Sequence, residues 1–285
     1  MPNSIELFTT YIDLLDEVYA SASKTVDLDG DTAVVRAGAT GNEIMIPKMT
    51  LDGLADYSRN SGYVRGDVNL TYETVKFNYD RGRKFIVDTM DNAETAGIAF
   101  GKLSSEFIRT KVVPEMDAFR FAEYAKNATK ATGTLSTGAD VIAAIRAGVN
   151  EMDEAEVPAE NRILYITPTL YGMISDLDTT KSKEVLSQFS KVVTVPQSRF
   201  NTEITLKDGK TEGQEAGGFE TTGSDINFMI VHKGAVIQYP KHTVDKVIAP
   251  EANQESDGWM FFYRAYGLAD VYENKAAGIY VHKGK

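Results

Sequence analysis

The sequence contains one helical pattern that is longer than the width of a compact domain. This pattern restricts the folds that the chain can adopt. Asp91 followed by Glu94 has the spacing of a capping box, and apolar residues then recur at helical spacing as far as Asn127. A helix of about 36 residues at 1.5 Å per residue spans roughly 55 Å. Pro114 predicts a kink or restart in its middle. We therefore expect this helix to form the long axis of an elongated, flattened domain.

The segment before this helix has the alternation of a β-hairpin. Ile44–Pro47 can begin one strand, and residues 71–80 alternate cleanly, with Val75, Phe77 and Tyr79 on one face. Residues 51–67, between the two strands, are rich in Asp, Arg, Asn, Gly and Tyr and predict a long polar tip. Because an isolated two-stranded ribbon is marginally stable in water, we expect this hairpin to pack against another body.

The remaining pattern mixes helices and strands and predicts an α+β fold. Residues 3–22 predict an amphipathic helix that packs either on its own domain or on a neighbour. Further helices are expected at 140–153 and from Thr167-Pro168 onward, and residues 207–223 are expected to form a solvated loop. Strands are expected at 163–166, 191–195, 226–231, 243–248, 259–272 and 278–282.

Composition excludes several classes of protein. The 285 residues carry a formal net charge of −11, which argues against a protein that binds duplex DNA through a basic face. The chain has no cysteine, so disulfides, thiol nucleophiles and thiolate metal sites are excluded, as in proteins of reducing compartments. No apolar run approaches the roughly 18 residues that cross a bilayer, and we see no secretory signal.

The sequence offers no constellation of catalytic or metal-binding residues. The three histidines, His232, His242 and His282, lack a second ligand one helical turn away. Residues 27–31 resemble a calcium loop, but its glycine is misplaced and Gly38 stands where a carboxylate should close the loop. Residues 209–211 end like a phosphate-binding loop without its first glycine. We therefore predict no catalytic residue, no metal and no cofactor, and we do not expect an enzyme.

Three segments, taken in order, resemble the major capsid proteins of tailed bacteriophages, which have the Hong Kong 97-type coat fold. They are the helical stretch VVPEMDAFRF (112–121), the stretch VPAENRILYITPTLY (157–171), and RAYGLADVYENK (264–275) followed by Gly278-Ile279. The similarity in element order covers nearly the whole chain.

The resemblance implies a division of the chain into parts. Residues 1–40 would form an N-terminal arm, 41–89 an extended hairpin loop, and 90–133 a peripheral domain with the spine helix. Residues 134–242 would form a compact axial domain, 243–272 a hairpin of the peripheral domain, and 273–285 a strand returning to the axial domain.

The resemblance also implies a structural function. Copies of the chain would assemble into pentamers and hexamers of an icosahedral shell that encloses phage double-stranded DNA without binding it specifically. Assembly would take place in the cytoplasm of the host bacterium, and the partners would be the chain itself, a separate scaffolding protein and a portal, with no membrane.

We expect contacts between copies to use residues of the hairpin, the spine helix and the 250–258 turn. Basic residues of the hairpin would face acidic residues of the neighbour's spine region, where exposed pairs set register more than affinity. Apolar burial by Tyr57, Tyr63, Phe77 and Tyr79 would supply more of the free energy. The candidate interface residues are Tyr57, Arg59, Tyr63, Arg65, Arg81, Arg83, Glu94, Glu106, Glu115, Gln254, Glu255 and Asp257, with Lys84 and Asp117 as further members of the charged set.

Three other classes of protein remain open at this point. An encapsulin-like compartment would use the same fold to enclose enzyme cargo. A soluble α/β binding module or hydrolase would be a monomer or small oligomer with a concave site. A tail or connector component would rarely need so long a helix.

Overall fold

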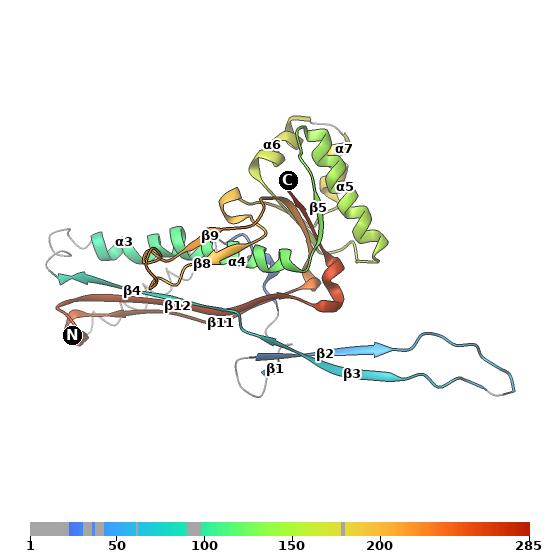
Figure 1. The fold of residues 1–285 in the computed structure, drawn as a ribbon, viewed down its shortest axis with the longest axis horizontal. Coiled ribbons are helices and arrows are strands. Elements are labelled where there is room, and N and C mark those ends of the chain that lie inside the picture. Colours follow the sequence, from blue (N-terminus) through green and yellow to red (C-terminus); the bar gives the residue numbers. More distant parts are fainter. Residues whose placement is uncertain (1–22, 31–35, 38–42, 61, 90–97, 178–179) are drawn as a thin grey trace.

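The computed structural model describes residues 23–30, 36–37, 43–60, 62–89, 98–177 and 180–285. The helix expected at residues 3–22 and the capping box expected at Asp91 lie outside this part of the chain. Figure 1 shows an elongated molecule: a long three-stranded sheet and a hairpin extend in opposite directions, and a compact unit of helices and strands stands over their junction.

The compact unit is built on a five-stranded sheet in the order β5-β13-β10-β6-β7. Its strands are β5 (Thr129–Thr132), β13 (Ile279–Lys283), β10 (Ile226–His232), β6 (Arg162–Ile166) and β7 (Lys191–Thr194). Helices α5 (Gly138–Glu154), α6 (Pro168–Leu177) and α7 (Thr180–Ser187) contribute to its core. All residues of β6 are buried, as expected of a central strand with an unbroken apolar run. The C-terminal strand β13 lies between β5 and β10, so the last strand of the chain is an interior strand of this sheet.

The elongated part is a three-stranded sheet covered by the spine helix. β11 (Val236–Ile248), β12 (Gly258–Val271) and β4 (Tyr79–Asp88) pair antiparallel in that order. The helix comprises α3 (Ile98–Phe107), a π-helical segment η3 (Ile108–Val112) and α4 (Val113–Lys126). Aromatic rings join the two layers, because Phe107 packs edge-on against Phe85 and Phe261.

Pro114 interrupts the hydrogen bonding of the spine helix, as predicted, without ending the helix. The π-helical residues 108–112 lie directly before it, and Pro114 occupies the first turn of α4. Proline has no amide hydrogen, and its ring crowds the carbonyl of the residue four positions earlier. The wider π-turn accommodates that ring, and the described helix continues from Ile98 to Lys126.

The hairpin is formed by β2 (Glu43–Leu51) and β3 (Val68–Lys76), and β1 (Arg36–Ala37) pairs with β2. The continuous strand predicted over residues 71–80 is wrong, because the chain leaves the hairpin after Lys76 and enters β4 at Tyr79. Asn78 stabilises this crossing: its side chain donates to the carbonyl of Ala269 (2.8 Å) and accepts from the amide of Ala269 (3.1 Å). Residues 79–88 therefore belong to the spine sheet and not to the hairpin loop that was expected to run to residue 89.

The predicted loop at 207–223 is also wrong in part. β8 (Ile204–Leu206) and β9 (Phe219–Thr221) form a short hairpin, and only the residues between them form a loop. The shorter helical turns are η1 (Val26–Leu28), η4 (Gln197–Arg199), η5 (Lys233–Ala235), η6 (Pro250–Ala252) and η7 (Glu273–Gly278).

Candidate assembly surfaces

The tip of the hairpin gathers four of the predicted interface residues. All four are exposed to solvent, and the exposed fraction of Tyr63 is 90%; the four residues are Tyr57, Arg59, Tyr63 and Arg65. The rings of Tyr57 and Tyr63 lie 4.9 Å apart, and the turn between them is closed by the amide of Gly62, which donates to the carbonyl of Ser58. The tip therefore presents two aromatic rings and two guanidinium groups at the end of an arm (Figure 1).

The charged residues of β4 pair within their own chain. Arg81 Nε lies 2.7 Å from Glu115 Oε1, and Arg81 Nη2 donates to the carbonyl of Gly218. Arg83 donates to the carbonyl of Glu215 (2.9 Å). Arg81 was expected to face one of several acidic residues of a neighbour, but the spine helix and β4 bring it together with Glu115 of its own chain.

Other members of the predicted charged set also have partners in the same chain. Glu106 pairs with Arg109 on the same helix, at 2.7 Å, and Lys84 pairs with Glu255 at 2.6 Å. Glu94 lies outside the described residues. Exposed pairs of this kind contribute only about 0–1 kcal/mol, so they can exchange partners at little cost.

Two aromatic residues predicted to be buried by a neighbour instead pack within their own chain, Tyr79 buried and Phe77 partly buried. Tyr79 is only 5% exposed and packs against Phe119 of the spine helix. Phe77 stacks on Tyr266, with ring centroids 4.9 Å apart, and Lys241 lies over the Phe77 ring. The alternation that placed them on one face of the hairpin is real, but the strand changes sheets before it reaches them.

The turn between β11 and β12 carries the remaining predicted residues, Gln254, Glu255 and Asp257. All three are exposed. The side chain of Asn253 organises the turn by accepting from the amide of Glu255 and donating to the carbonyl of Gly258. In Figure 1 this turn lies at the end of the spine sheet, away from the hairpin. The exposed candidates at the hairpin tip and at this turn therefore lie at opposite ends of the molecule, whereas Arg81, Arg83, Glu106 and Glu115 lie on β4 and the spine helix between them.

A groove of about 670 Å³ lies between β4, the spine helix and the 207–218 loop. Phe85, Leu103 and Phe107 provide apolar walls, and the loop residues Gly209 and Gly217 approach the guanidinium of Arg83. Hydrogen bonds from the Thr211 hydroxyl and two loop amides lower the pKa of Asp208 to about 2. In the groove lining, the Glu115 carboxylate is held by Arg81 and the Asp208 carboxylate by donors of the loop. The described residues that line the groove include no histidine. Nothing in this lining pairs a nucleophile with a base.

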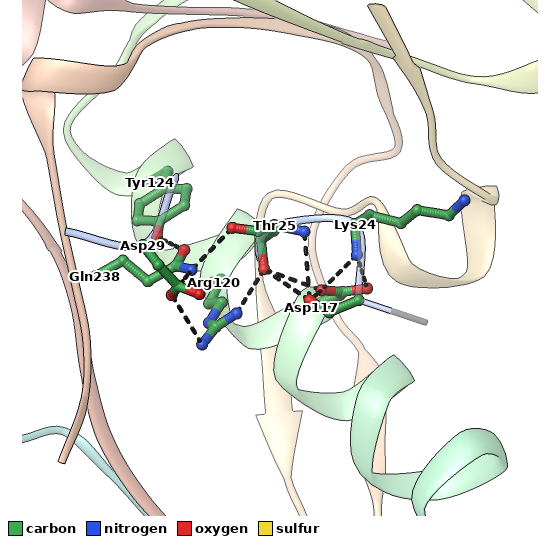
Figure 2. A network of polar contacts seen from close by, with 8 residues as sticks. Lys24, Thr25, Asp29, Asp117, Arg120, Tyr124 and Gln238 are labelled. Atoms are coloured by element: carbon green, nitrogen blue, oxygen red, sulfur yellow. Dashed lines mark hydrogen bonds and ion pairs between the residues drawn. The ribbon is translucent and has the colours of Figure 1, made fainter. Parts of the chain in front are cut away.

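Sequence reasoning missed a buried polar network around Asp117 (Figure 2). Asp117 is fully buried and accepts hydrogen bonds from the Ser23 hydroxyl (2.8 Å), the Lys24 amide (3.0 Å) and the Thr25 hydroxyl (3.0 Å). Arg199 approaches its other side at 3.3 Å. One carboxylate on the spine helix therefore binds three consecutive residues from a segment more than ninety positions earlier.

Neighbouring residues extend this network to β11. Arg120 donates to the Thr25 hydroxyl (2.7 Å), and Gln238 donates to the Thr25 carbonyl (2.8 Å) and to Asp29 (2.6 Å). The Tyr124 hydroxyl donates to Gln238, and burial raises the pKa of Tyr124. Residues 23–30 are thus fixed to the spine helix and to β11. The signal in the sequence was the presence of charged residues such as Asp117 and Arg120 among apolar residues of the helix. Their partners in residues 23–29 lie too far along the chain to be inferred from this pattern.

The histidines do not form a cluster. Burial lowers the pKa of His232 and of His282. The ring of His282 stacks on Phe228, and its Nδ1 lies 3.0 Å from the side-chain nitrogen Nδ2 of Asn227. Among the described residues, no three side chains of the types that bind metals come together. Within the same part of the chain, no helix has the length and apolarity needed to span a membrane.

Comparison with known proteins identifies the fold. No protein-family model and no curated protein matches the sequence. Among solved structures, the mature capsid of bacteriophage PhiM1 superposes with a TM-score of 0.58 at 11% identity, over 87% of this chain and 84% of that one. The capsid of cyanophage P-SCSP1u gives 0.57 at 12% identity, over 88% and 85%.

A third solved structure is the virus-like particle from Pyrococcus furiosus. It superposes with a TM-score of 0.54 at 10% identity, over 93% of this chain and 98% of that one. All three superpositions extend over most of both chains, so the likeness concerns the whole architecture and not one motif. The chain therefore has the Hong Kong 97-type capsid fold, an α+β fold, as the three sequence segments predicted.

Proposed function

We propose that this protein is the major capsid protein of a tailed bacteriophage. The observation that carries the proposal is the likeness to phage capsids over most of both chains, together with an arm that projects from the body. The proposal assigns the protein a structural role: identical copies form pentamers and hexamers, and these close into a shell around double-stranded DNA.

The shape of the chain supports head-to-tail association. Its hairpin tip and its β11–β12 turn lie at opposite ends, so one copy offers two different surfaces to its neighbours. Contacts between unlike surfaces are heterologous, and they close into rings when the rotation per copy allows it. Many weak contacts in a closed shell then act together and give strong avidity.

The proposal includes partners that belong to assembly. A separate scaffolding protein would guide closure in the cytoplasm of the host bacterium, and a portal would occupy one vertex. The net charge of −11 on each copy would keep packaged DNA from adhering to the shell, within the screening length of about 8 Å at physiological salt.

A protein compartment of the encapsulin type is the second candidate. The likeness to the Pyrococcus furiosus virus-like particle, over 98% of that chain, is compatible with it, because that structure is named a virus-like particle and not a phage capsid. The same shell would then enclose protein cargo in place of DNA.

Electron microscopy of the purified protein, alone and with a co-expressed candidate scaffold, tests the shared part of both proposals. We expect closed icosahedral particles. Only soluble monomers or small oligomers under every condition would contradict the proposal. The two candidates then separate, because a protein that co-purifies inside the particles favours the compartment, whereas particles that form only with the scaffold favour the phage capsid protein.

A further inference from the structure

The cross-strand pairs of the hairpin define two faces with different chemistry. Residues that pair directly lie on the same face, and alternate residues of a strand lie on opposite faces. One face, named here the basal face, carries the pairs Ile44–Val75, Ile46–Glu73, Lys48–Thr71 and Thr50–Asn69. The other face carries Met45–Thr74 close to the body and, further out, Pro47–Tyr72, Met49–Leu70 and Leu51–Val68. The last six residues are named here the distal apolar face.

The basal face is turned toward the body of its own chain. Ile44 and Val75 are 3% and 6% exposed and pack in one cluster with Ile237 and Leu268. Further out, Lys48 pairs with Glu273 at 3.0 Å. Partial burial raises the pKa of the Glu73 carboxyl, and the nearby Glu273 carboxylate raises it further. Contact with the chain's own body therefore reaches at least to Lys48.

The apolar residues change face beyond that point. Near the body, Ile44, Ile46 and Val75 occupy the basal face and only Met45 lies on the other, whereas further out every apolar residue of the two strands lies on the opposite face. Met49, Leu51, Val68, Leu70 and Tyr72 are between 52% and 66% exposed, and the residues behind them, Thr50, Asn69 and Thr71, are polar. A strand buried on one side keeps its apolar residues in one phase of the two-residue period. A change of phase indicates that a different body covers the outer half.

The exposed area is large enough to be a contact surface. At roughly 100 Å² of exposed surface for each large side chain, the distal apolar face amounts to on the order of 500 Å², which is in the range of the largest patch on a typical monomer. Beyond the strands, Leu54, Tyr57, Tyr63 and Val64 at the tip are exposed as well, with exposed fractions from 61% to 107%. Together they approach the roughly 800 Å² that each partner buries in a stable complex.

We propose that the distal apolar face is buried by a second copy of this chain in the assembled shell, while the basal face at the same level stays accessible. The inference rests on the proposed function, because the shell supplies the second copy. It adds the side of the hairpin that docks, and it shifts the docking contact from the tip charges to apolar pairs along the outer strands. Near the body, the hairpin would thus be buried on its basal face by its own chain. Further out, it would be buried on the opposite face by the neighbouring copy.

The absence of cysteine from the sequence makes a direct test possible. Leu70→Cys places a single thiol on the distal apolar face. Asn69→Cys, at the adjacent position of the same strand, places one on the basal face. Both variants are treated with a polar maleimide, as unassembled subunits and as purified shells. We expect similar modification rates in subunits. In shells the Leu70→Cys thiol should react at least about tenfold more slowly, and the Asn69→Cys thiol should change by less than about threefold, because exposure governs thiol reactivity.

A second pair of variants keeps the test decisive if one substitution prevents assembly. Met49→Cys lies opposite Leu70, and Thr50→Cys lies opposite Asn69. Failure of both apolar-face variants to assemble, with normal shells from both polar-face variants, also supports the inference. Any result in which the two faces behave alike overturns it. If the unmodified chain forms no shells, the proposed function itself fails, and microscopy reports that outcome separately.

Discussion

Replacing Asp117 by asparagine should destabilise the folded subunit more than any surface charge change. The buried carboxylate accepts three hydrogen bonds from residues 23–25 and pairs with Arg199. An asparagine of the same shape retains one acceptor oxygen, but its amide group would face N–H donors on the other side. Hydrogen bonds to a charged group contribute about 1.5–3 kcal/mol each. Breaking a buried ion pair costs about 3–5 kcal/mol, and we expect a loss within that range.

The matched control is Asp80→Asn. Asp80 also accepts two hydrogen bonds from one arginine, Arg264, at 2.8 and 2.7 Å, but its side chain is 48% exposed. Solvent screens such a pair, so its loss should cost about 0–1 kcal/mol. The two variants therefore make the same chemical change at a buried and at an exposed site.

Urea unfolding of unassembled subunits, followed by the fluorescence of Trp259, the only tryptophan, measures both effects. A second readout is the rate of tryptic cleavage after Lys24. This rate should rise in Asp117→Asn because the backbone amide of Lys24 loses its hydrogen-bond acceptor. The reasoning would be refuted if Asp117→Asn lost no more stability than Asp80→Asn, or if cleavage after Lys24 were unchanged.

Three further predictions concern packing, pH and the 207–218 loop. A Cβ on Gly148 of α5 would lie 2.6 Å from the ring of Tyr280, so Gly148→Ala should cost about 1–3 kcal/mol in urea unfolding. Gly172→Ala in α6 meets nothing within 4 Å and should gain about 0.5–1 kcal/mol; equal effects at both sites would contradict the packing argument. Burial lowers the pKa of His282, so its contribution to stability is complete above pH 6.5 and is lost as the pH falls through the folded-state pKa. His282→Gln should therefore flatten the stability profile below pH 6.5, and an unchanged profile would exclude this histidine as a cause. Arg81→Ala removes the hydrogen bond to the loop and should accelerate tryptic cleavage after Lys210 several-fold, measured by mass spectrometry of timed digests; no acceleration would show that the loop is held by other contacts.

Local sequence patterns predicted several elements well. The helix expected at residues 140–153 is α5, although its capping box of Thr137 and Asp140 was not foreseen, and the buried strand at 163–166 follows its apolar run. The alternation near residues 44–47 and 71–76 correctly indicated a hairpin. Such features depend on residues a few positions apart, which are always close in space.

Predictions that needed a distant partner succeeded less often. The sequence interpretation set Arg81 opposite an acidic residue of a neighbouring copy, and the fold places Glu115 of the same chain beside it. Phe77 and Tyr79 follow the alternation of the hairpin, yet the crossing at Asn78 carries them into the spine sheet. The change of apolar phase along the hairpin can be read from the sequence once the pairing register is known.

The sequence by itself determined the kinds of elements, their order along the chain, and the lack of thiol chemistry. It did so because capping, helical spacing and strand alternation are local properties. Only the tertiary structure decided which sheet β4 joins, what binds the carboxylate of Asp117, and which face of the hairpin stays uncovered. Those outcomes depend on contacts between residues far apart in the chain, and burial in a shared core selects among pairings that local propensity leaves equal.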